Sequence, residues 1–71
     1  MLKLYGRRHC HLCEEMAQAL RRRGVAFEEI DVDGAPDLKE RYGRFVPVLT
    51  DGEGRELCRY RLDAAALRQI P

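Results

Sequence analysis

Two cysteines three residues apart, Cys10 and Cys13, lie between an apolar run and a helical pattern near the start of the chain. Residues 1–5 predict a strand, and residues 14–20 predict a helix. The i, i+3 spacing of a helix places both sulfurs on one side of its first turn, close enough to form a small disulfide ring or to share a metal ion. The chain must therefore fold so that a strand ends, and a helix begins, at this pair.

Cys10 is the thiol that this placement activates. At the N-terminus of a helix, unpaired N–H groups and the helix dipole stabilise an anion, which lowers the pKa of a thiol and favours the reactive thiolate. Arg7, Arg8 and His9 add positive or potentially positive charge directly upstream. The two glutamates that follow Cys13 partly oppose the thiolate, but we expect the net field at Cys10 to favour the anion.

Composition and charge restrict the class of protein. The 71 residues predict one domain, residues 1–71, near the size below which a single hydrophobic core is marginal. The formal net charge is +1, without the basic field typical of nucleic-acid binding. An odd number of cysteines, and the lack of any apolar segment of signal-peptide or membrane-spanning type, argue against a secreted or membrane protein. We expect a cytoplasmic monomer that binds neither nucleic acid nor membrane.

Proline, glycine and aspartate divide the rest of the chain into alternating strands and helices. The predicted elements are a strand over 25–32, a helix over 36–42, strands over 46–50 and 56–62, and a final helix over 64–70 that Asp63 caps. Alternation in the last strand places Cys58, Tyr60 and Leu62 on one face. Cys58 is then a small core residue rather than a third redox centre.

The connections predict how these strands pair. The element order is βαβαββα, and the first crossover makes strands one and two parallel and right-handed. Residues 51–54 form a hairpin turn signal, so strands three and four are antiparallel. If strand three lies antiparallel beside strand one, Pro47 faces Cys10 across the edge of the sheet.

With C-x-x-C after the first strand and Val46-Pro47 opening the third, the chain resembles thioredoxin-fold proteins. Within that fold it is similar to the glutaredoxin branch, especially the short bacterial glutaredoxin-like proteins. The stretches 4–13, 29–33 and 42–49 carry the resemblance, which runs nearly end to end. It implies an α/β, thioredoxin-like (glutaredoxin-type) βαβαββα fold with a four-stranded mixed sheet flanked by helices.

The resemblance also implies roles for individual residues. Cys10 matches the nucleophilic cysteine of the family, and Cys13 matches the resolving one. Pro47 matches the family's cis-proline, so the Val46 main chain is expected to pair with a bound cysteine-containing peptide. Arg7 stands where glutaredoxins usually carry a lysine that contacts a glutathione carboxylate. The implied substrate-binding residues are Arg7, His11, Leu12, Val46 and Pro47.

Two departures from the family pattern bear on the substrate. The Gly-Gly that helps to hold glutathione before the last helix is replaced by the bulkier Arg59, Tyr60 and Arg61. The usual Pro-Tyr between the cysteines is replaced by His11-Leu12. We therefore predict that the protein handles a protein disulfide better than a glutathione mixed disulfide.

Thiol–disulfide exchange is the predicted reaction, with Cys10 attacking a substrate disulfide and Cys13 displacing the reduced product. It needs no bound cofactor, and glutathione or a reductase restores the electrons. One alternative is a metal-binding module, but His9 and His11 cannot easily join both cysteines on one ion and no second C-x-x-C exists, so no metal ligands are assigned. A cluster shared between two chains through Cys10 stays open. The other alternative is a non-catalytic binding module with the same fold.

Three local features have a functional and a plain structural interpretation. His11 either stabilises the Cys10 thiolate as a partial cation or is an exposed residue of the first turn without influence. The arginines of residues 21–23 fit a solvated helix end rather than a docking patch for a partner, since cations there complement the dipole. Residues 31–34 predict a turn, because they lack the remaining ligands of a calcium loop.

Overall fold

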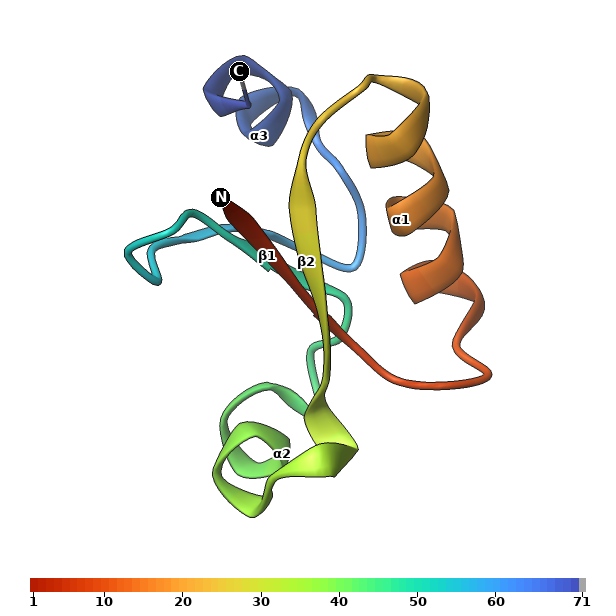
Figure 1. The fold of residues 1–71 in the computed structure, drawn as a ribbon, viewed down its shortest axis with the longest axis vertical. Helices are drawn as coiled ribbons and strands as arrows, with labels where there is room; N and C mark the ends of the chain where they lie inside the picture. The colour runs from red at the N-terminus through yellow and green to blue at the C-terminus, as the bar shows by residue number, and fades with distance from the viewer. Residues whose placement is uncertain (71) are drawn as a thin grey trace.

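A mixed sheet of four strands lies at the centre of the computed structural model, which describes residues 1–70 (Figure 1). The strands are β1 (Leu2–Gly6), β2 (Phe27–Asp31), β3 (Val48–Thr50) and β4 (Glu56–Arg59), in the spatial order β2-β1-β3-β4. β1 pairs with β2 in parallel, whereas β3 runs antiparallel to both β1 and β4. The topology predicted from the crossover and the hairpin turn is confirmed.

Helices cover both faces of this sheet. They are α1 (His11–Arg22), α2 (Pro36–Tyr42) and α3 (Ala64–Gln69), with a short 3₁₀ helix η1 (Val32–Gly34) before α2. Leu2 and Leu4 of β1 pack with buried residues of α1 and α3, whereas Tyr5 packs with Val32 and Tyr42 on the opposite face. Because successive residues of a strand point to opposite faces, β1 supplies both cores. The sheet is thus sandwiched between α1 and α3 on one side and α2 on the other.

The first helix owes its position to a regular apolar spacing. Its buried residues, Cys13, Met16, Ala17 and Leu20, recur every three or four positions and face the sheet. The helix begins at His11 with Cys10 as its N-cap, so both cysteines lie at its N-terminal end, as predicted. The C-terminal arginines are exposed, as expected for a solvated end, although Arg21 also pairs with Glu29 of β2.

The end of β4 differs from the prediction. The strand stops at Arg59, and Tyr60 has a φ of 68° and is 44% exposed, so the prediction that it shares an inner face with Cys58 is wrong. The reason lies in the neighbouring strand. Tyr60 N–H donates to the Pro47 carbonyl at 2.8 Å, but proline has no N–H to return, and the ladder ends there.

The remaining boundaries are close to those predicted. β2 and β3 are shorter than expected, because Val32 begins η1 and Pro47 lies outside the strand that it precedes. Pro36 opens α2, and Asp63 caps α3 by accepting a hydrogen bond from Ala66 N–H at 2.8 Å. Across residues 1–70, no helix has the length and apolar character needed to cross a membrane.

Candidate active site at the Cys10–Cys13 pair

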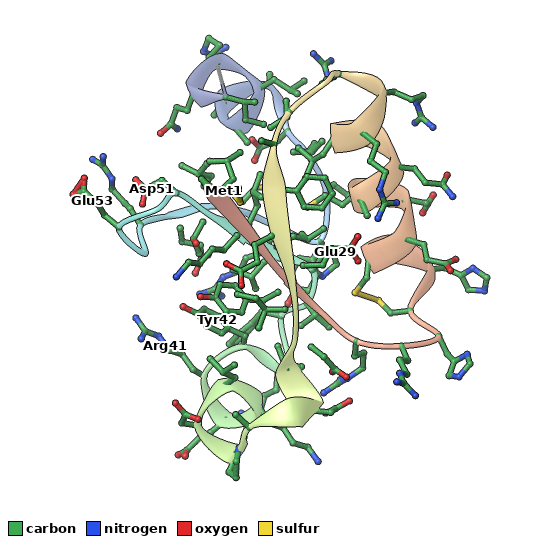
Figure 2. The ribbon with its side chains drawn as sticks, in the orientation of Figure 1. Met1, Glu29, Arg41, Tyr42, Asp51 and Glu53 are labelled. Atoms are coloured by element: carbon green, nitrogen blue, oxygen red, sulfur yellow. A yellow bond between two sulfur atoms is a disulfide. The ribbon has the colours of Figure 1, made fainter. Side chains whose placement is uncertain are left out.

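Cys10 and Cys13 form a disulfide at the start of α1, drawn as the yellow bond in Figure 2. Their Cα atoms are 5.2 Å apart. Cys10 is the N-cap residue of α1: its backbone is extended, and its Sγ accepts a hydrogen bond from Cys13 N–H at 3.2 Å. As predicted, the Cys10 sulfur lies among the N–H groups of a helix N-terminus, where a thiolate is stabilised.

The two sulfurs differ in how far solvent can reach them. Cys13 is 7% exposed, whereas Cys10 is only partly buried. Cys13 packs against the end of β1, where a Cβ on Gly6 would lie 3.1 Å from its Sγ. A side chain at position 6 would therefore push Cys13 aside by a few tenths of an ångström. An incoming disulfide can reach Cys10 more easily than Cys13, which suits the roles of attacking and resolving thiol.

The residues flanking Cys10 are open to solvent. Arg8, His9 and His11 are all exposed, and His9 has a φ of 58°. A histidine in this left-handed conformation is uncommon, and such residues often mark functional loops. The exposure of His11 fits its interpretation as a surface residue of the first turn. Its effect on the Cys10 thiolate and its part in substrate binding stay predictions.

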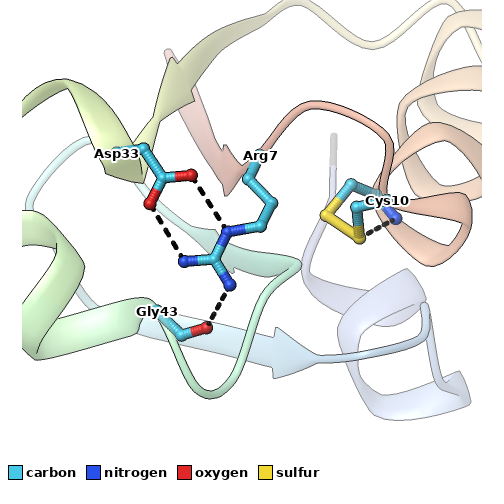
Figure 3. Close-up of a disulfide and its surroundings, with 5 residues drawn as sticks. Arg7, Cys10, Asp33 and Gly43 are labelled. Carbon is cyan, nitrogen blue, oxygen red and sulfur yellow. Dashed lines mark hydrogen bonds and ion pairs between the residues drawn. A yellow bond between two sulfur atoms is a disulfide. The ribbon is translucent and has the colours of Figure 1, made fainter.

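Arg7 makes an internal contact that the sequence did not reveal (Figure 3). Its Nε and Nη2 donate to the two carboxylate oxygens of Asp33 at 3.2 and 3.1 Å, and its Nη1 donates to the Gly43 carbonyl at 3.1 Å. The guanidinium points away from the disulfide toward these two partners (Figure 3). Arg7 thus joins the segment before Cys10 to η1 and to the end of α2. Its contact with a glutathione carboxylate stays a prediction.

Asp33 and Gly43 are site residues that sequence reasoning missed. The hydrogen bond from Arg7 is the main reason that the pKa of Asp33 lies below its ordinary value of 3.8. Asp33 lies 26 positions from Arg7, so no local pattern links the two. Within the sequence, the only available signal was an aspartate directly before a glycine at a turn, which by itself indicates a turn rather than a partner.

The Val46–Pro47 peptide bond is cis, as predicted. Pro47 is fully buried, and Val46 is partly buried. Since Tyr5 of β1 pairs with Val48 of β3, the Val46–Pro47 segment lies at the edge of the sheet where β1 ends. The disulfide and this segment therefore share one edge, in agreement with the expected placement. Pairing of the Val46 main chain with a substrate stays a prediction.

Two hollows flank the first turn of α1. One, of about 470 Å³, lies between α1 and the ends of β1 and β2, and its lining includes Cys13, Arg8 and Glu29. The other, of about 330 Å³, lies between α1 and the segment after β4, and its lining includes Leu12 and Tyr60. The disulfide thus has a polar hollow on the side of Cys13 and a more apolar one on the side of Leu12.

Cys58 lies apart from this chemistry. It is a buried, free cysteine in the core cluster beneath α1 and α3, which confirms the prediction that it is a core residue. Burial is the main reason that the pKa of its thiol is raised to about 11, with the charges of Asp63 and Glu56 adding to it. In the part of the chain that the structure describes, no group of three or more His, Cys, Asp or Glu side chains has an arrangement that could hold a metal ion.

Comparison with known proteins places this geometry in a family. The family model described as Glutaredoxin-like domain (DUF836) matches residues 1–70. The X-ray structure of a structural genomics target protein from X. campestris is 41% identical, with a TM-score of 0.81 over 97% of this chain and 92% of that one. The solution structure of protein Ne2328 from Nitrosomonas europaea is also 41% identical, with a TM-score of 0.80 over 96% and 86% of the two chains.

More distant structures share the fold. A buckwheat glutaredoxin, solved as a complex with glutathione, is 21% identical, with a TM-score of 0.65 over 83% of this chain and 60% of that one. At that identity the likeness shows the thioredoxin-type glutaredoxin fold and nothing finer. No curated protein matches the chain.

Proposed function

The chain belongs to the glutaredoxin-like domain family, and we propose that it is a thiol–disulfide oxidoreductase. One observation carries the proposal: the Sγ of Cys10 caps α1 and accepts the N–H of Cys13, while Cys13 itself is buried behind it. A thiol at a helix N-terminus ionises more readily than a free one, and the thiolate is the nucleophile in disulfide exchange. The more exposed sulfur is therefore also the one placed for activation.

In the proposed reaction, the Cys10 thiolate attacks one sulfur of a substrate disulfide. That S–S bond breaks, a mixed disulfide forms with Cys10, and the other substrate sulfur leaves as a thiolate that takes up a proton. Cys13 then loses its proton and attacks Cys10 Sγ, which releases the second substrate thiol. Two electrons pass from the dithiol to the substrate, and the protein is left as the Cys10–Cys13 disulfide.

Protein disulfides are the proposed substrates, in a reducing compartment such as the cytoplasm. A thiol such as glutathione, or a reductase, returns two electrons to the disulfide after each turnover, so the cycle needs no bound cofactor. The N–H hydrogen bond to Cys10 Sγ supports this cycle because it stabilises the thiolate both as nucleophile and as leaving group.

The test is the reduction of insulin disulfides with dithiothreitol as electron donor, followed as turbidity. We expect Cys10→Ser to abolish the catalysed rate, and Cys13→Ser to accumulate a mixed disulfide that mass spectrometry detects. Cys58→Ala is the matched control, because it removes the free cysteine, which lies outside the disulfide. If Cys10→Ser reduces insulin as fast as the unmodified protein, the pair has no catalytic role and the non-catalytic binding module becomes the better interpretation.

A further inference from the structure

A groove of about 330 Å³ lies between α1 and the segment that follows β4, and Leu12, the residue before Cys13, is part of its lining. Among residues 1–70, three large apolar side chains are exposed, namely Met1, Leu12 and Tyr60. Two of these, Leu12 and Tyr60, line this groove although they are far apart in sequence. Scattered single apolar residues on a surface need no explanation, but two that meet at one hollow indicate a contact surface.

The backbone of Tyr60 holds its ring at this groove in an unfavourable conformation. Its φ of 68° is a backbone angle that residues other than glycine rarely adopt. The turn is tight: Arg61 N–H donates to the Arg59 carbonyl at 2.7 Å, a three-residue turn around Tyr60. Glycine would take this conformation without strain, yet the position carries an exposed aromatic ring. Strain retained at an exposed residue indicates that the side chain has a use.

The groove adjoins the segments that carry the proposed chemistry. Leu12 lies between the two cysteines, and Tyr60 N–H donates to the carbonyl of Pro47 at 2.8 Å. A polypeptide bound with its own cysteine at Cys10 therefore has this groove beside it. The groove is lined by the residue that precedes Cys13 and by the segment hydrogen-bonded to Pro47, and not by the cysteines themselves.

The lining of the groove indicates what kind of chain it suits. Its inner wall is apolar, formed by the buried Met16 with the partly buried Ala19 and Leu62. Its rim carries opposite charges, with Glu15 on α1 and Arg61 after β4, both exposed. Over residues 1–70, Arg61 makes no ion pair, whereas Arg59 beside it pairs with Glu56. The guanidinium of Arg61 is free to meet a carboxylate from a ligand.

We propose that this groove binds the polypeptide next to the reacting cysteine of a protein disulfide. It takes a large apolar side chain between Leu12 and Tyr60, and Arg61 pairs with an acidic side chain beside it. The inference rests on the proposed function and names its substrate class: a polypeptide disulfide with an apolar and an acidic residue near the cysteine. A small thiol without an apolar side chain gains no binding free energy from the apolar wall of the groove.

Single-turnover kinetics with synthetic peptides test the groove directly. The probes are hexapeptides of sequence Gly-Asp-Leu-Gly-Cys-Gly, each linked through its cysteine to thionitrobenzoate, and matched peptides with alanine for leucine or lysine for aspartate. The Cys10 thiolate of the pre-reduced protein attacks the peptide sulfur and the coloured thiolate leaves. Cys13 then releases the peptide thiol, so the protein's own dithiol supplies both electrons. We expect the leucine peptide to react about fivefold faster than the alanine peptide, as half-burial of the leucine side chain implies.

Tyr60→Gly is the decisive variant because it removes the ring and relieves the backbone strain together. We expect its Tm to be equal to or above that of the unmodified protein, and its leucine-to-alanine rate ratio to fall to about one. A ratio that stays at the original value in a folded Tyr60→Gly protein overturns the proposal. So does a dimer of the unmodified protein that dissociates in this variant, because the groove would then be an interface between two copies.

A charge exchange tests Arg61 separately. We expect Arg61→Glu to slow the aspartate peptide and to speed the lysine peptide, reversing their order. Arg68→Glu on α3 makes the same change of charge outside the groove, and we expect it to keep the original order. Equal effects of the two variants would mean that net charge alone acts, and would overturn the role of Arg61. If the unmodified protein releases no thionitrobenzoate from any peptide, the proposed function fails rather than the groove.

Discussion

Replacing Gly6 with alanine tests whether the close approach of β1 to Cys13 sets the redox properties of the pair. A Cβ on Gly6 would lie 3.1 Å from Cys13 Sγ and 3.2 Å from Cys13 Cβ, so the neighbouring atoms must move by a few tenths of an ångström. In the disulfide, the bond to Cys10 holds the Cys13 sulfur in place. In the dithiol, the Cys13 side chain is free to rotate away from the new methyl group. The strain against Sγ therefore falls mainly on the oxidised form, whereas the contact with Cys13 Cβ, which does not move when the side chain rotates, is present in both forms.

The size of the effect follows from the cost of overpacking. Inserting a methyl group into a filled site costs about 1–3 kcal/mol. If about 1–2 kcal/mol of this falls on the disulfide alone, the reduction potential becomes about 20–40 mV less negative, since 30 mV corresponds to about 1.4 kcal/mol for two electrons. The variant should be a stronger oxidant than the unmodified protein.

Equilibration in defined ratios of reduced and oxidised dithiothreitol, followed by alkylation and mass spectrometry, measures this potential. Gly34→Ala is the matched control, because a Cβ there would meet nothing within 4 Å, and we expect its potential to be unchanged. A Gly6→Ala potential that is unchanged or more negative, in a folded protein, would refute the reasoning. It would mean that both redox forms bear the strain equally, or that the dithiol bears more of it.

The remaining predictions concern the thiols and the Arg7–Asp33 pair. At neutral pH we expect Cys10 in Cys13→Ser to be alkylated faster than Cys13 in Cys10→Ser, because only Cys10 caps the helix; equal or reversed rates would contradict the assigned roles. The pKa of Asp33 is lowered from 3.8 by the hydrogen bond from Arg7, so its stabilisation is present above that pH and is lost as the pH falls. In urea unfolding, Asp33→Asn should therefore lose less stability than the unmodified protein as the pH falls. Equal losses in the two proteins would contradict a stabilising Arg7–Asp33 pair. Burial raises the pKa of Cys58 from 9.0 to about 11, so its stabilisation is present below pH 9.0 and is lost as the pH rises to about 11. Over that range the free energy of unfolding should fall by roughly 2–3 kcal/mol more in the unmodified protein than in Cys58→Ala, at about 1.4 kcal/mol per pKa unit. Equal falls in the two proteins, measured by urea unfolding at each pH, would contradict this.

Local chemistry was sufficient to predict the order and pairing of the elements. The apolar spacing of α1, the proline that opens α2 and the aspartate that caps α3 each act within one helical turn, so each can be recognised from neighbouring residues. The length of the first crossover and the hairpin turn then determine the strand directions. The cis Val46–Pro47 bond is different, since it was predicted from the resemblance and not from the residues alone.

Contacts that depend on the assembled fold were not predictable in the same way. The alternation of apolar residues continues from Cys58 to Leu62, and nothing within that stretch indicates a break. The strand ends because its partner position in the sheet is Pro47, which lacks an N–H. The pairing of Arg7 with Asp33 is likewise visible only once β1 and η1 are brought together. Long-range partners of this kind leave no periodic pattern in the sequence.

The surroundings of the disulfide support the proposed preference for a polypeptide substrate over a small carboxylate-bearing thiol. Arg7 already uses three of its five guanidinium N–H donors on Asp33 and Gly43, so a ligand carboxylate at this guanidinium shares a charge that Asp33 already neutralises. The side chain of Arg7 is 33% exposed and that of Asp33 is 44% exposed, and a further ion pair at such exposure gains little free energy. On the other side, an apolar side chain bound between Leu12 and Tyr60 removes hydrocarbon from water, and half-burying a leucine is worth about 1 kcal/mol. Only a ligand with such a side chain gains this free energy, so the preference that we propose for a protein disulfide comes from the apolar groove and is not opposed by the charge on Arg7.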